Sequence, residues 1–178
     1  MIDQKYRGLI IIGYQGIGKS TYACQETRCI DLESSNFKIN GNRQPDWYII
    51  YCKIAISLAK QGYVVFTSSH KQVINEFASQ PKDNGYDIII VAPSKAIGDS
   101  WIDRLRMRYE MNPTIKNKIA WKDAENNFYE EIDYLMHDAP FPIILINDIK
   151  NHYMARVIKG CCEIYHTHTR CTSGLARE

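Results

Sequence analysis

The sequence predicts one α/β domain built around a parallel sheet of five strands, with helices on both faces. Two observations lead to this prediction. Short apolar runs alternate along the chain with longer segments whose apolar residues recur at helical spacing, as expected for strands joined by crossover helices. The first apolar run, Leu9–Ile12, passes directly into a glycine-rich turn, as a buried parallel strand often does.

Length and composition are those of an ordinary globular domain. The chain has 178 residues, of which 45% are hydrophobic and 24% are charged. The net charge of +2 gives no general affinity for polyanions, so a nucleic-acid partner is not favoured. No apolar run reaches the roughly 20 residues that span a bilayer, and the N-terminus lacks the apolar core of a signal peptide. We therefore expect a cytoplasmic protein without a membrane partner, as a monomer or homodimer.

The expected strands are short and regularly spaced, at residues 8–13, 29–31, 63–67, 87–92 and 142–146. The expected helices lie at residues 19–27, 46–61, 71–79, 95–109 and 150–158, with two further short helices within 114–136. Helix 46–61 is supported by apolar residues at helical spacing, namely Trp47, Ile50, Tyr51, Ile54 and Leu58. Gly62 follows where a helix would stop, and Leu32–Pro45 is predicted as a polar loop.

Right-handed crossovers leave few possible topologies, and the strand order 2-3-1-4-5 is the simplest. The domain is expected to cover residues 1–160, followed by a polar tail at 161–178. Ligands of such sheets bind beyond the carboxyl ends of the strands. Polar segments follow all five expected strands there, at Gly13–Ser20, Asp31–Phe37, Ser68–His70, Pro93–Lys95 and Asn147–Lys150.

The segment Gly13–Ser20 matches the phosphate-binding pattern G-x-x-x-x-G-K-[ST] in full. Gly13, Gly16 and Gly18 permit backbone conformations in which successive N–H groups point at phosphate oxygens. Lys19 places a cation near the β- and γ-phosphates, and Ser20 offers a hydroxyl to Mg²⁺. Two more residues complete the predicted nucleotide site, Ile17 within the loop and Thr21 in the following helix. The motif predicts a three-layer α/β/α P-loop fold that binds ATP with Mg²⁺.

Two carboxylates follow the second expected strand, Asp31 and Glu33. Being two residues apart in an extended segment, they face the same way. Asp31 is a candidate for holding Mg²⁺ together with Ser20, and Glu33 for orienting the acceptor. Arg43, in the predicted loop, is a candidate for binding a second phosphate, although a solvated surface arginine would look the same.

The third expected strand ends in hydroxyls and an imidazole, including Ser69 and His70, rather than in the acidic pair of motor-like ATPases. These side chains suit a small polar acceptor. Arg104 and Arg108 are four residues apart and share one helical face, where they would neutralise charge on a transferred phosphoryl group. The alternative is a solvated basic face. The Lys- and Asn-rich segment 109–136 lies where a water-excluding lid would be useful.

These residues together resemble the nucleoside monophosphate kinase branch of P-loop kinases, which includes the adenylate kinases. The resemblance rests on Gly13–Ser20, the acidic pair Asp31 and Glu33, Arg43, and the R-x3-R of Arg104 and Arg108. It implies ATP and Mg²⁺ at the loop and an acceptor-binding segment at 31–60 with Arg43 on the acceptor phosphate. It further implies Arg104 and Arg108 on the transferred group, and the donor base beside Asn147–Lys150. The segment D-L-E-S-S-N-F is also similar to kinase-like proteins of phages and mobile elements.

Two other functions stay open at this stage, an NTPase or switch acting on a macromolecule and a polynucleotide 5′-kinase. The tail holds a cluster of possible zinc ligands, Cys161, Cys162, His166, His168 and Cys171. Their spacing matches no common zinc finger, so either a metal site or a frayed tail fits.

Overall fold

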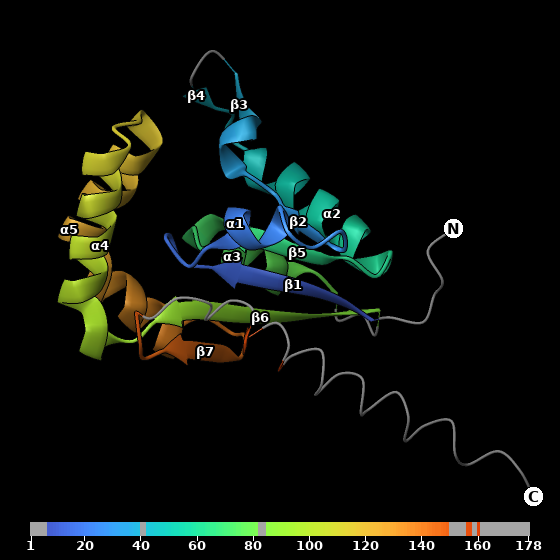
Figure 1. Cartoon of the computed structure of the whole chain (residues 1–178). Coiled ribbons are helices and arrows are strands. Elements are labelled where there is room, and N and C mark those ends of the chain that lie inside the picture. The colour runs from blue at the N-terminus through green and yellow to red at the C-terminus, as the bar shows by residue number, and fades with distance from the viewer. Residues whose placement is uncertain (1–6, 40–41, 82–84, 150–155, 158–159, 161–178) are drawn as a thin grey trace, which may run out of the picture.

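The computed structural model describes residues 7–39, 42–81, 85–149, 156–157 and 160. Five parallel strands form one sheet in the order β2-β5-β1-β6-β7, with helices on both sides (Figure 1). The strands are β1 (Gly8–Gly13), β2 (Cys29–Asp31), β5 (Val64–Ser68), β6 (Tyr86–Pro93) and β7 (Ile143–Ile146). The predicted α/β class and the five-stranded parallel sheet are confirmed.

The segment between β2 and the next helix is more structured than the predicted loop Leu32–Pro45. It contains a short 3-10 helix, η1 (Ser34–Phe37), and an antiparallel hairpin of β3 (Lys38–Ile39) and β4 (Asn42–Arg43). These two strands lie outside the main sheet but are numbered with the others. The labels of the main-sheet strands, β2-β5-β1-β6-β7, therefore differ from the predicted 2-3-1-4-5. The prediction of a plain loop was wrong because the pairing of two-residue strands leaves no periodic signal.

The helices are α1 (Lys19–Ala23), α2 (Trp47–Lys60), α3 (Lys71–Ser79), α4 (Gly98–Met111) and α5 (Ile115–His137), and the 3-10 helix η2 (Lys95–Ile97) precedes α4. The expected helix at 19–27 is thus only five residues long, and its weak dipole adds little to anion binding. The segment after Ala23 turns the chain back into β2, which begins at Cys29.

The two short helices expected within 114–136 are one continuous helix of 23 residues, α5. The Thr114 side chain caps it by accepting a hydrogen bond from the Asn117 N–H, and no glycine or proline interrupts residues 115–137. Its second half is anchored by buried apolar residues, Ala124, Phe128, Ile132 and Leu135. Burial along that half explains why α5 continues as one helix through its polar residues instead of dividing into two.

Helices α2, α3 and α5 lie along one face of the sheet. On α2 the buried side chains are Trp47, Tyr51, Cys52, Ala55 and Ala59. Ile50 and Ile54, expected on the buried face, are instead 60% and 38% exposed. The buried face of α2 approaches the sheet closely at Ala59, since a Cβ on Gly8 would lie 1.8 Å from the Ala59 carbonyl oxygen.

Helix α5 continues this layer beside α3, since the Tyr134 hydroxyl donates to Asn75 Oδ1 at 3.2 Å. Helix α1 covers the opposite face. There the Tyr22 ring packs edge-on against the Phe66 ring, with the two ring centres 6.2 Å apart. The strands point towards the hairpin of α4 and α5, which extends beyond the edge of the sheet (Figure 1). The carboxyl ends of β1, β2 and β5 thus lie between this hairpin and the β3–β4 hairpin.

Two sequence predictions fall outside the described residues. The expected helix at 150–158 is described only at residues 156–157, and the cysteine and histidine cluster of the tail lies wholly beyond the description. Among the described helices, none combines the length and apolarity needed to cross a membrane.

Candidate functional site

The glycine-rich turn after β1 has the backbone that a phosphate-binding loop requires. Gly16 and Gly18 have φ of 85° and 90°, a left-handed conformation that strains residues with a side chain. Gly18 is the residue from which α1 begins. Ile17, between them, is fully buried and fixes the loop to the core. Gly13 leaves room for neighbouring side chains, since a Cβ there would lie 2.8 Å from the Lys19 Cδ.

The Lys19 side chain folds back across the loop. Its Nζ donates to the Gly13 carbonyl at 2.5 Å and approaches the Tyr14 carbonyl at 3.4 Å. Burial lowers the pKa of Lys19 to about 8, while Asp31 and Glu33 act in the opposite direction. The two hydrogen bonds hold the ammonium group inside the curve of the loop, where an anionic ligand would raise its pKa again.

Ser20 and Asp31 meet at the edge of the same loop. The Ser20 Oγ donates to Asp31 Oδ2, joining the start of α1 to the end of β2. Burial raises the pKa of the Asp31 carboxyl, and the Ser20 hydrogen bond and Lys19 oppose the shift. A hydroxyl and a carboxylate side by side are hard oxygen donors that fit Mg²⁺ bound to a nucleotide. Thr21, one residue further, is exposed on α1.

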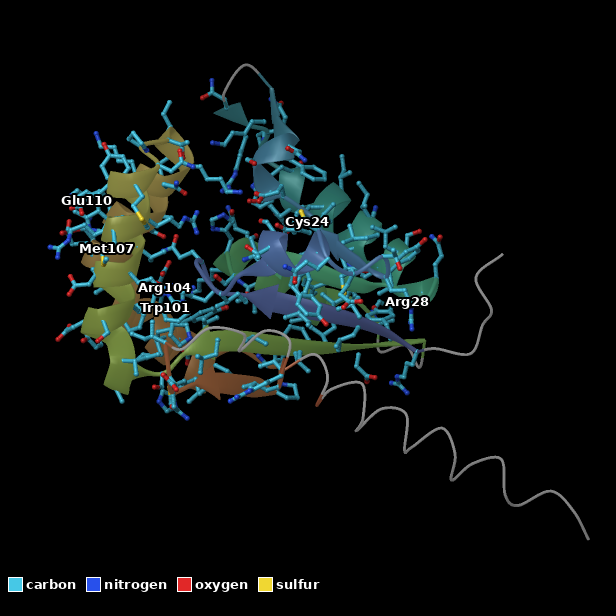
Figure 2. The ribbon with its side chains drawn as sticks, in the orientation of Figure 1. Cys24, Arg28, Trp101, Arg104, Met107 and Glu110 are labelled. Atoms are coloured by element: carbon cyan, nitrogen blue, oxygen red, sulfur yellow. The ribbon has the colours of Figure 1, made fainter. Side chains whose placement is uncertain are left out.

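Helix α4 supports the loop from one side. The buried Trp101 donates its indole N–H to the Gln15 carbonyl at 3.1 Å, and Leu105 packs on Gly16. Arg104 lies beside Trp101, with its guanidinium 5.3 Å from the ring centre, and both are on α4 in Figure 2. The sequence identified Arg104 but missed Trp101, although Trp101 stands three residues earlier on the same helical face.

Two side chains of α5 form hydrogen bonds with the first two residues after Gly13. The Tyr14 hydroxyl donates to Glu131 Oε2 at 2.9 Å, and the Gln15 amide donates to Asp123 Oδ2 at 3.2 Å. Burial, and then the charge of Asp123, raises the pKa of Glu131 to about 7. These contacts join parts of the chain more than 100 residues apart, with sequence separations of 117 and 108, so no local pattern could have revealed them.

Arg108 is positioned by a side chain that sequence reasoning did not select. Asn117, only 6% exposed, accepts from Arg108 Nε and Nη2 at 2.8 and 2.5 Å. The same Asn117 amide donates to the Asn112 carbonyl at 2.8 Å, across the turn between α4 and α5. Arg108 stands three residues after Leu105, which packs on Gly16, so the two share the face of α4 that is turned to the loop, and the charge of Arg108 lowers the pKa of Lys19.

Across the site, Arg43 is exposed on β4 rather than in an irregular loop. Its Nη2 donates to Ser34 Oγ at 3.1 Å and lies 2.9 Å from His70 Nε2. The guanidinium also lies over the Trp47 ring, 4.5 Å from its centre. The hairpin, η1 and the segment after β5 therefore bring Arg43, Ser34 and His70 together. The strand ends placed Ser34 and His70 at the same edge of the sheet, but they did not place Arg43 there.

Loss of solvent around His70, and then the Arg43 charge, lower the pKa of His70 to about 4. The imidazole is therefore neutral at physiological pH and accepts from Arg43 at Nε2, which leaves Nδ1 as a donor. Lys19 also lowers the pKa of His70, and Ser68, two residues before His70, pairs with Gly13 at the start of the glycine-rich loop. Ser69, next to His70, is partly buried.

The segments that follow β2 and β5 are tied together by the buried Tyr51. Its hydroxyl donates to the Leu32 carbonyl at 2.7 Å and accepts from the Ser68 N–H at 2.9 Å. Glu33 follows Leu32 and forms an ion pair with Lys116 at the start of α5. This ion pair is a direct contact between the segment after β2 and the α4–α5 hairpin, and the sequence did not indicate it.

Of the remaining candidates, Asn147 is exposed after β7, and Lys150 lies outside the described residues. The described part of the chain contains no group of three metal-binding side chains of the His, Cys, Asp and Glu type. Comparison with known proteins adds no identification, because no protein-family model and no curated protein matches this chain.

Proposed function

We propose that this protein is a P-loop kinase that transfers the γ-phosphoryl group of ATP to a small acceptor, a nucleoside or deoxynucleoside monophosphate. The observation that carries the proposal is that two cations lie beyond the ends of neighbouring strands. Lys19 lies inside the glycine-rich loop after β1, and Arg43 contacts His70, which follows β5. Gly13 pairs with Ser68, so the loop and the segment that carries His70 leave β1 and β5 at the same level of the sheet. Two cationic groups at one edge of a sheet suit a reaction between two phosphate-bearing substrates.

The donor half would bind the triphosphate through the backbone of Gly13–Ser20 and the Lys19 ammonium. Ser20 and Asp31 would hold Mg²⁺, which would neutralise negative charge on the phosphates. Arg104 and Arg108 approach the loop from α4 and would stabilise charge on the transferred group.

The acceptor half would bind a phosphate through the Arg43 fork, the Ser34 hydroxyl and the remaining N–H of His70. Tyr51 joins the two segments that make up this half, the one after β2 and the one after β5, through its two hydrogen bonds. Lys19 and Asp31 would thereby act at the donor phosphates, whereas Arg43, Ser69 and His70 would position the acceptor.

The experiment is incubation with ATP, Mg²⁺ and a panel of ribo- and deoxyribonucleoside monophosphates, with diphosphate products separated by chromatography. We expect ADP and one acceptor diphosphate to form in equal amounts, and Lys19→Met to abolish both. Equal ATP consumption with and without every acceptor would contradict the kinase proposal and favour an NTPase. Phosphorylation of an oligonucleotide 5′-end, but of no mononucleotide, would favour a polynucleotide kinase instead.

A further inference from the structure

The ion pair between Lys116 and Glu33 spans the two halves of the site. Lys116 lies at the exposed start of α5, and Glu33 follows β2, 83 residues earlier in the chain. The Lys116 side chain is 58% exposed and that of Glu33 is 30% exposed. Exposed ion pairs of this kind add little to fold stability, so the contact is easily exchanged for another.

The turn that carries Lys116 is held in a defined position. Asn117, the next residue, is buried and accepts two hydrogen bonds from Arg108 while donating to the Asn112 carbonyl. This network fixes the start of α5 relative to α4. The flexible part is the Lys116 side chain itself, a four-carbon stem ending in a mobile ammonium group.

Contacts link the Lys116–Glu33 pair to the glycine-rich loop. Ser20, next to Lys19, donates to Asp31, and Glu33 stands two residues after Asp31. Asp31 and Glu33 raise the pKa of Lys19, and Lys116 and Arg108 lower it. Without a ligand, the carboxylates balance part of this positive charge, and Glu33 pairs directly with Lys116. A triphosphate in the loop would bring much more negative charge to the same place than Glu33 offers.

We propose that Lys116 is a further phosphate-binding residue of the donor site, and that the bound triphosphate displaces Glu33 as its partner. This inference rests on the proposed function. The displaced Glu33 carboxylate becomes available to accept a hydrogen bond from a hydroxyl group of the acceptor. Donor binding therefore prepares the acceptor half, and Glu33 competes with the donor for Lys116 until the donor binds.

The test is the dissociation constant of a non-hydrolysable ATP analogue with Mg²⁺, measured by calorimetry on the full chain. Lys116→Met removes the cation and should weaken binding about tenfold, as expected for loss of a charge-assisted contact. Glu33→Gln removes the competitor and should tighten binding about threefold. The double variant should bind like Lys116→Met alone, because Glu33 then has no partner to compete for.

Lys118→Met is the matched control, since Lys118 is an exposed lysine two residues further on a different side of α5. It should leave the dissociation constant unchanged, and thermal melting should show that all four variants are folded. If Lys116→Met and Glu33→Gln change affinity in the same direction, or if neither changes it, the exchange is refuted. Failure of the wild-type protein to bind the analogue would instead refute the proposed function itself.

Discussion

The proposed donor and acceptor halves of the site are built in different ways. The donor half is mostly backbone: the loop lies directly at the end of a buried strand, and Trp101, Tyr14 and Ile17 anchor it to the interior. The acceptor half is mostly side chain, with the exposed Arg43 presented by a hairpin of two-residue strands. The difference indicates a rigid donor site and an acceptor site whose specificity depends on a few replaceable groups.

The largest expected effect is on the donor half. Lys19→Met should weaken binding of an ATP analogue by about 100-fold, because it removes a charge-assisted contact from a preformed site. Isothermal calorimetry with Mg²⁺ present measures this directly. Lys53→Met, at an exposed lysine of α2, is the control and should bind like the wild type.

The same substitution should stabilise the ligand-free protein. Burial lowers the pKa of Lys19 from 10.5 to about 8, so below pH 8 the fold bears the cost of a poorly solvated charge. The unfolded chain binds more protons between these two values, so wild-type stability rises with pH across that window and is lowest below it. At pH 7, Lys19→Met should raise the melting temperature by roughly 2–4 °C. A lower melting temperature would show that Lys19 supports the fold rather than the ligand.

This contrast also explains what the sequence could predict. The loop Gly13–Ser20 could be predicted because its proposed role depends on consecutive residues. The positions of Asp31 and His70 could be predicted because both follow the ends of strands. The partners of these residues were not predictable. Asn117 behind Arg108 and Glu131 behind Tyr14 are fixed by the packing of α4 and α5, which depends on contacts distant in sequence. The β3–β4 hairpin was missed since two-residue strands carry no periodicity.

A smaller effect is expected in the acceptor half. Arg43→Ala should raise the KM for the acceptor at least about tenfold and change the KM for ATP less than about twofold, because Arg43 contacts Ser34, His70 and Trp47, which belong to the proposed acceptor half. Arg43→Lys keeps the charge but loses the planar guanidinium, so its KM for the acceptor should lie between those of the wild type and Arg43→Ala. Steady-state kinetics with each substrate varied in turn separates the two constants.

Arg106→Ala is the matched control for Arg43, since Arg106 is an exposed arginine whose nearest charges are Asp103 and Glu110 on its own helix. It should alter neither KM. An equal rise in both KM values for Arg43→Ala would contradict the division into two halves, because it would mean that this guanidinium contributes equally to binding of ATP and of the acceptor.

The smallest expected effect concerns the support beneath the donor loop. Burial and the nearby charge of Asp123 raise the pKa of Glu131 from 4.5 to about 7, against the opposing hydrogen bond from Tyr14. The folded state therefore binds more protons than the unfolded state between these values. This contribution to stability is fully present below about pH 4.5 and is lost as the pH rises through about 7.

Glu131→Gln removes this titration but keeps an oxygen that accepts from the Tyr14 hydroxyl. At pH 8 the variant should be more stable than the wild type by on the order of 1 kcal/mol, about 2–4 °C in melting temperature, and at pH 5 the difference should shrink towards zero. Melting curves of both proteins across that range give the comparison. A stability difference independent of pH would mean that the Glu131 charge is well solvated and that the donor loop is held by packing alone, chiefly by Trp101 and Ile17.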